Sequence, residues 1–225
     1  MIRIAVLLVV FCSGAALLSL EMIGIRDVQP VFGNDVYVYG SLISVFLGGL
    51  ALGAFVGGRL ADREPSFGML AAVLGAAGFL VLLIPLVDDL VMDWTFPGQG
   101  PPEPVEWDET GRAKIDDYQY PDLKWPVLGC GTILFAAPAI LLGMVTPYAA
   151  KLLIRTIPHV GTSVGYISGL STAGAIFGTL GTTFYLVGEM DTPWILVSNG
   201  LVLLAMALLL VLLHVLAPRP MPAGG

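Results

Sequence analysis

The stretch Gly49–Arg63 has the sequence GLALGAFVGGRLADR, an apolar helix that runs into a short charged loop. Four residues are close to one helical turn, so Gly49, Gly53 and Gly57 lie along one side of the helix. In hydrocarbon, such a strip lets the backbone of another helix come close, and dispersion and Cα–H···O contacts then act between them. We therefore expect this stretch to pack tightly against a second membrane helix.

The composition of the whole chain indicates a membrane protein. Of its 225 residues, 56% are hydrophobic and 12% are charged. Several apolar runs exceed the length that crosses a bilayer core, including the first, which is too long for the apolar part of a signal peptide. The sequence predicts an all-α polytopic membrane protein with six transmembrane helices, at about residues 4–25, 36–58, 67–87, 127–152, 164–187 and 194–216.

This pattern divides the chain into four parts. Helices one to three occupy residues 1–87, helices four to six occupy 127–216, and 217–225 form a short tail. Between them, residues 88–126 carry ten acidic and three basic side chains, which accounts for the net charge of -7. We expect an acidic extracellular segment here. Its charge either attracts cations, polyamines among them, or only keeps the segment soluble.

Lysine and arginine set the orientation, because short cytoplasmic loops carry more of them. With the N-terminus inside, Arg26 is the one basic residue in the short outer loops. The predicted location is the cell membrane with both termini cytoplasmic. The basic residues on the cytoplasmic side are then Arg3, Arg59, Arg63, Lys151, Arg155 and Arg219.

The sequence contains no recognisable set of catalytic residues, metal ligands or cofactor-binding residues, and no basic face for nucleic acid. Glu21 is the strongest candidate for a functional residue, because ionisable groups inside a membrane are costly. It either holds a cationic ligand or a proton, or forms an interfacial ion pair. Its partner would be Arg26 or a group on another helix, since five residues is a poor spacing for a helical pair.

A shift of 125 residues indicates an internal repeat. It places Gly40, Gly49 and Gly53 on Gly165, Gly174 and Gly178, and Arg26 on Lys151. The two halves would then be inverted three-helix repeats, a plan that recurs in transporters. Chance is the alternative, because the chain has 28 glycines. On either reading, Gly174 and Gly178 have helix-packing spacing.

Two resemblances to known families follow from these motifs. Gly58, Leu60, Asp62 and Arg63, between the second and third spans, resemble the core of the loop motif of the major facilitator superfamily. That motif continues with a glycine and further basic residues, whereas this chain has Glu64-Pro65-Ser66. Six spans are also half of such a transporter.

The second resemblance covers nearly the whole chain and is to the membrane domain that precedes spermidine synthase-like proteins. It rests on the order and spacing of Ser13-Gly14-Ala15-Ala16, Glu21 with Arg26, Val31-Phe32-Gly33, Val36-Tyr37, Gly48 through Arg63, Pro138 with Gly143 and Pro147, and Gly165-Tyr166 with Ala173-Gly174-Ala175 and Gly178. In that family a soluble aminopropyltransferase-like domain follows, which residues 1–225 do not include.

The resemblance implies a non-catalytic membrane subunit that anchors or channels for a separate soluble synthase-like partner at the cytoplasmic face. The alternative is a small homodimeric transporter that moves a cation, such as a polyamine, past Glu21. A weaker third hypothesis makes the acidic segment the working part. No cofactor is expected, and the bilayer is the one partner that all three share.

Overall fold

Six long helices make up the described part of the chain. In the computed structural model this part comprises residues 2–63, 65–97, 123–154 and 160–216, and every element in it is helical. Six helices are long and apolar enough to cross a membrane, which confirms the predicted fold class. The elements are α1 (Ile2–Phe32), α2 (Val36–Arg63), α3 (Phe67–Thr95), α4 (Lys124–Ile154), α5 (Val160–Gly181), the π-helix η1 (Thr182–Leu186), α6 (Val187–Glu189) and α7 (Thr192–Leu216).

Several helices extend further than the sequence predicted. Helix α1 ends at Phe32 rather than near residue 25, α2 at Arg63 rather than 58, and α3 at Thr95 rather than 87. Hydropathy falls where a chain leaves the hydrocarbon. A helix can continue beyond that point, because its backbone groups still form hydrogen bonds within the helix. The Gly58–Arg63 motif is therefore the end of α2 and not a loop. Likewise, residues 88–95 of the predicted acidic segment belong to α3, and residues 98–122 lie outside the described part.

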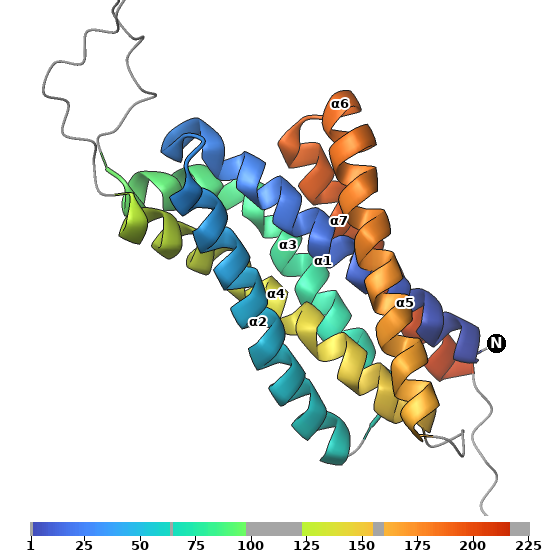
Figure 1. The fold of residues 1–225 in the computed structure, drawn as a ribbon. Helices are drawn as coiled ribbons and strands as arrows, with labels where there is room; N and C mark the ends of the chain where they lie inside the picture. The colour runs from blue at the N-terminus through green and yellow to red at the C-terminus, as the bar shows by residue number, and fades with distance from the viewer. Residues whose placement is uncertain (1, 64, 98–122, 155–159, 217–225) are drawn as a thin grey trace, which may run out of the picture.

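The helices associate in three close pairs, which Figure 1 shows. Helix α2 packs on α4, α5 packs on α1, and α3 packs on α7. Contacts of α4 with α3 and of α1 with both α4 and α7 join the pairs into one bundle. Helices α2 and α5 stand on opposite sides of this centre (Figure 1).

Glycine brings α2 into backbone contact with α4. Gly49, Gly53 and Gly57 are all buried and all face α4. A Cβ on Gly53 would overlap the carbonyl oxygen of Ile140, and one on Gly57 would lie 2.7 Å from Cα of Met144. The predicted strip therefore lies where α2 is tightest against its neighbour.

The other two pairs use glycine in the same manner. On α5, a Cβ on Gly174 would overlap the carbonyl oxygen of Phe11, and one on Gly178 would overlap that of Ala15. Between α3 and α7, Gly78 faces Gly200, with 2.9 Å from its would-be Cβ to the Gly200 oxygen. Each pair thus owes its close approach to missing side chains, because in lipid no hydrophobic drive brings helices together.

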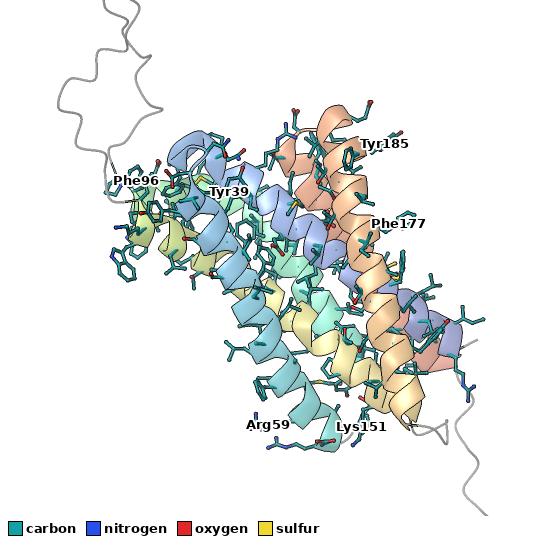
Figure 2. All side chains as sticks on the ribbon, in the orientation of Figure 1. Tyr39, Arg59, Phe96, Lys151, Phe177 and Tyr185 are labelled. Atoms are coloured by element: carbon teal, nitrogen blue, oxygen red, sulfur yellow. The ribbon has the colours of Figure 1, made fainter. Side chains whose placement is uncertain are left out.

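Charge separates the two ends of the bundle. Arg59 and Lys151 lie at one end (Figure 2), where α2 and α4 finish. The opposite end carries Asp88, Asp89 and Asp93 near the end of α3. The basic motif at the end of α2 and these three aspartates of α3 are therefore at opposite ends of the helices.

Candidate functional site

Glu21 lies on the inner side of α1 with 9% of its surface exposed. No ion pair joins it to Arg26 within the described residues, because five residues turn a helix by about 140° beyond one full circle and the two side chains diverge. Arg26 instead donates from Nη1 to the carbonyl oxygen of Val187, at 3.1 Å. The bond ties the C-terminal part of α1 to the residue that follows the π-helix.

A second carboxylate on α1 was not singled out from the sequence. Asp27 has its Oδ2 atom buried with no hydrogen-bond partner. Asp88 and Asp89 of α3 are close enough to act on it electrostatically. Sequence patterns do not bring these three carboxylates together, because Asp27 lies beyond the predicted end of the first span and Asp88 and Asp89 lie in the predicted acidic segment.

The motif at the end of α2 serves as a link between two helices. Asp62 pairs with Lys151 of α4 at 2.6 Å, with both side chains exposed. Leu60 packs against the core, Gly58 faces open space and Arg63 is exposed in the last turn. An exposed pair of this kind contributes at most about 1 kcal/mol to stability. Its main effect is to hold the Lys151 ammonium group beside the end of α2.

The most complete polar arrangement within the membrane-crossing region joins three helices. Ser19 of α1, Thr182 of η1 and Asn199 of α7 are all buried. The hydroxyl oxygens of Ser19 and Thr182 are 2.5 Å apart. Asn199 donates from Nδ2 to Ser19 Oγ and to the carbonyl oxygen of Ile195, each at 2.9 Å. We call Ser19, Thr182 and Asn199 the polar cluster.

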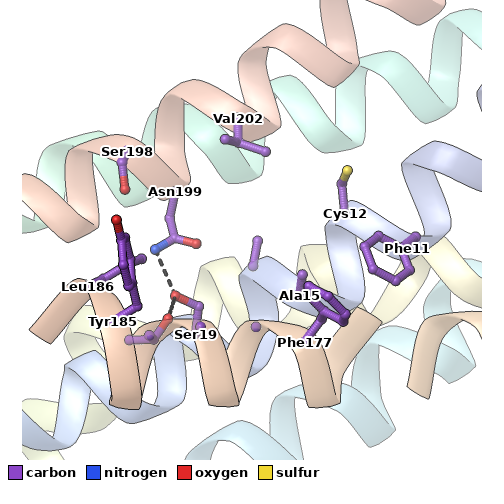
Figure 3. A pocket seen from close by; sticks show the side chains of 14 residues that line it. Phe11, Cys12, Ala15, Ser19, Phe177, Tyr185, Leu186, Ser198, Asn199 and Val202 are labelled. Carbon is purple, nitrogen blue, oxygen red and sulfur yellow. Dashed lines mark hydrogen bonds between the residues drawn. The ribbon is translucent and has the colours of Figure 1, made fainter. Parts of the chain in front are cut away.

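The polar cluster borders a groove of about 390 Å³ between α1, the α5–η1 segment and α7. Figure 3 shows the cluster at one side and apolar side chains such as Phe11 and Phe177 around the rest. Phe177 and Tyr185 are 72% and 69% exposed, so the groove opens toward the lipid-facing side of α5. Sequence reasoning missed it because the cluster spans 180 residues of chain. A lone asparagine in the apolar run of α7 was the one available signal.

A smaller groove of about 260 Å³ lies between α2 and α4. Its walls include Leu52, Ala136 and Ile140. The shift of 125 residues equates these with Phe177, Phe11 and Ala15, which line the larger groove. The polar cluster has no counterpart there, since the residue equivalent to Thr182 is Gly57.

Comparison with known proteins identifies no relative of this chain. No family model, no curated protein and no solved structure shows significant similarity to the chain. Within the described residues, no group of three or more His, Cys, Asp or Glu side chains could hold a metal ion.

Proposed function

We propose that this chain is a non-catalytic integral membrane subunit whose basic end anchors a soluble synthase-like partner. The positive-inside rule places that end, and with it both termini, on the cytoplasmic side of the cell membrane. The resemblance to the membrane domain of spermidine synthase-like proteins supplies the class of partner. The acidic end then faces outward.

The basic end is the observation that carries the proposal. Arg59 and Arg63 are exposed in the last turns of α2, and Lys151 is exposed on the adjacent α4. Asp62 accepts a hydrogen bond from Lys151, and the Arg59 guanidinium lies over the ring of Phe55, 6.0 Å from its centre. These contacts hold the cations in place, which favours recognition of an acidic protein surface.

Co-purification in mild detergent tests the anchoring function. We expect a soluble synthase-like protein to co-purify in stoichiometric amount with the native chain. The amount recovered should fall at least tenfold when Arg59→Glu is combined with Arg63→Glu, because like charges then repel each other across the interface. A matched control, Asp89→Lys with Asp93→Lys, reverses charge at the other end and should leave capture unchanged. Absence of any stoichiometric partner, or equal loss in both variants, counts against the proposal.

Transport is the second candidate, favoured by the packing of the helix pairs. Contact between Gly53 and Ile140 becomes, under the 125-residue shift, contact between Gly178 and Ala15, and both contacts are present. Gly57 against Met144 likewise corresponds to Thr182 against Ser19. These equivalences support two inverted three-helix repeats, α1–α3 and α4–α7, as in transporter folds.

A further contact supports the same symmetry. Gly78 and Leu203 are 125 residues apart in sequence, which is one shift, and a Cβ on Gly78 would lie 3.0 Å from Cβ of Leu203. Residues that are each other's equivalents meet only close to a two-fold axis. This contact supports a two-fold axis between α3 and α7 for the proposed repeat.

Uptake into liposomes tests the transporter function. We expect a homodimer that accumulates a labelled diamine or polyamine, and at least a tenfold lower rate in Glu21→Gln, because the amide cannot balance a cationic solute in the membrane. The conservative Glu21→Asp should retain part of the rate. Uptake that Glu21→Gln leaves unchanged rules Glu21 out as the cation site, and a protein inactive in liposomes leaves the anchoring proposal standing.

A further inference from the structure

The polar cluster leaves one hydrogen-bonding atom unused. Both hydrogens of the Asn199 amide are engaged, on Ser19 and on the Ile195 carbonyl. Because a carbonyl can only accept, the atom facing Ile195 must be the nitrogen. The remaining atom, Oδ1, has no partner among the described residues, and Figure 3 shows it directed into the space between the helices.

That oxygen belongs to a side chain that is 91% buried, since Asn199 keeps 9% of its surface. A carbonyl oxygen without a donor is unfavourable in an apolar environment. Asn199 is the eighth residue of α7 and lies about 10 Å from the end at which that helix begins. At that depth lipid supplies few hydrogen-bond donors. The structure therefore has a hydrogen-bond acceptor at the wall of a groove that no side chain or backbone group of the described residues engages.

The cluster also holds one surplus hydrogen. Ser19 and Thr182 have one hydroxyl hydrogen each, and the short contact between their oxygens uses one of the two. A group that both donates and accepts would complement the acceptor on Asn199 and this remaining hydrogen. A hydroxyl does both, whereas a ketone or an ether only accepts and a carboxylate places charge in an apolar groove.

The backbone at this point supports a ligand site. Thr182 begins the π-helix, and single π-turns within α-helices occur frequently at functional sites. Gly178 and Gly181 line the groove without side chains, while Phe11 and Phe177 supply its aromatic wall. The volume of about 390 Å³ is in the range of pockets that hold one small molecule.

We propose that the groove between α1, η1 and α7 binds an apolar alcohol from the bilayer, whose hydroxyl donates to Oδ1 of Asn199. The hydrocarbon part of the ligand lies along Phe11 and Phe177 and enters from the lipid side. This site is independent of both the docking of a soluble partner and the passage of a cation. Its ligand class follows from the donor and acceptor count together with the apolar walls.

Photolabelling of the purified full chain in nanodiscs tests the site. The probe is a long-chain alcohol carrying a diazirine, and the competitors are the unlabelled alcohol, its methyl ether and the matched ketone. We expect labels on peptides of α1, α5–η1 and α7. The alcohol should compete about fivefold better than the ether or ketone, the factor that one hydrogen bond of about 1 kcal/mol supplies.

Three variants separate the hydrogen bond from the shape of the groove. Asn199→Leu should abolish the preference for the alcohol. Ser198→Ala should keep it, because the Ser198 hydroxyl is already engaged with the Ile195 carbonyl at 2.8 Å. Val202→Trp fills the groove while leaving the three residues of the polar cluster unchanged in sequence, and it should abolish labelling of these peptides, which keeps the test valid if Asn199→Leu fails to fold.

Three outcomes overturn the proposal. The first is equal competition by alcohol, ether and ketone in the native chain. The second is labelling that Val202→Trp leaves in place or that falls on other helices. The third is a co-purifying phospholipid that the alcohol cannot displace, which makes the groove an ordinary lipid contact.

Discussion

Replacing Gly53 by valine is expected to disrupt the packing of α2 against α4 and to lower the thermal stability of the protein. A Cβ at this position overlaps the Ile140 carbonyl oxygen and lies 2.9 Å from Cα of Gly143. Both are backbone atoms of a packed helix, so neither can rotate away as a side chain could. Overpacking of this kind costs about 3 kcal/mol or more, and for a chain of this length we expect the unfolding midpoint to fall by roughly 10 °C.

The measurement is thermal unfolding in detergent, followed with a maleimide dye that fluoresces on reaction with cysteine. Cys130 is fully buried in α4 and reports loss of packing when it reacts. The matched control is Gly48→Val on the same helix, because a Cβ on Gly48 has nothing within 4 Å. Equal midpoints for the two variants would show that α2 does not depend on this contact.

The contrast between Gly53 and Gly48 also shows what the sequence could predict. Spacing alone placed Gly49, Gly53 and Gly57 on one strip, because the helical period is fixed by backbone geometry. The six spans followed from hydropathy for a similar reason, since the thickness of the bilayer sets their length. Neither argument identifies α4 as the partner, because packing order depends on contacts between residues far apart in the chain.

The candidate sites depend almost entirely on such distant contacts. Ser19 and Asn199 belong to different halves of the chain, and neither has a local motif that predicts the other. Arg26 was one of the two kinds of partner considered for Glu21. It donates instead to the Val187 carbonyl, which sequence patterns cannot distinguish from any other carbonyl. Helix ends were also misplaced, because hydropathy reports the edge of the lipid and not the last hydrogen bond.

Replacing Gly178 by valine is expected to displace α5 while leaving the rest of the bundle assembled. The new Cβ overlaps the Ala15 carbonyl oxygen on α1, so the clash is as severe as at Gly53. The consequence differs because the span that contains α5 is the least buried of the six. Loss of the α5–α1 contact therefore releases a largely exposed helix. Loss of the α2–α4 contact exposes α4, which also packs on α3 and α1.

The two cysteines distinguish local displacement from general unfolding. Cys12 lines the groove beside α5, while Cys130 is buried against other helices. In Gly178→Val we expect Cys12 to react several-fold faster with the maleimide at room temperature and Cys130 to stay unreactive, with the labelled residue identified by mass spectrometry. Gly181→Val is the control, since a Cβ there has nothing within 4 Å. Simultaneous labelling of both cysteines would mean that α5 is integral to the bundle, because the fold would then fail as a unit.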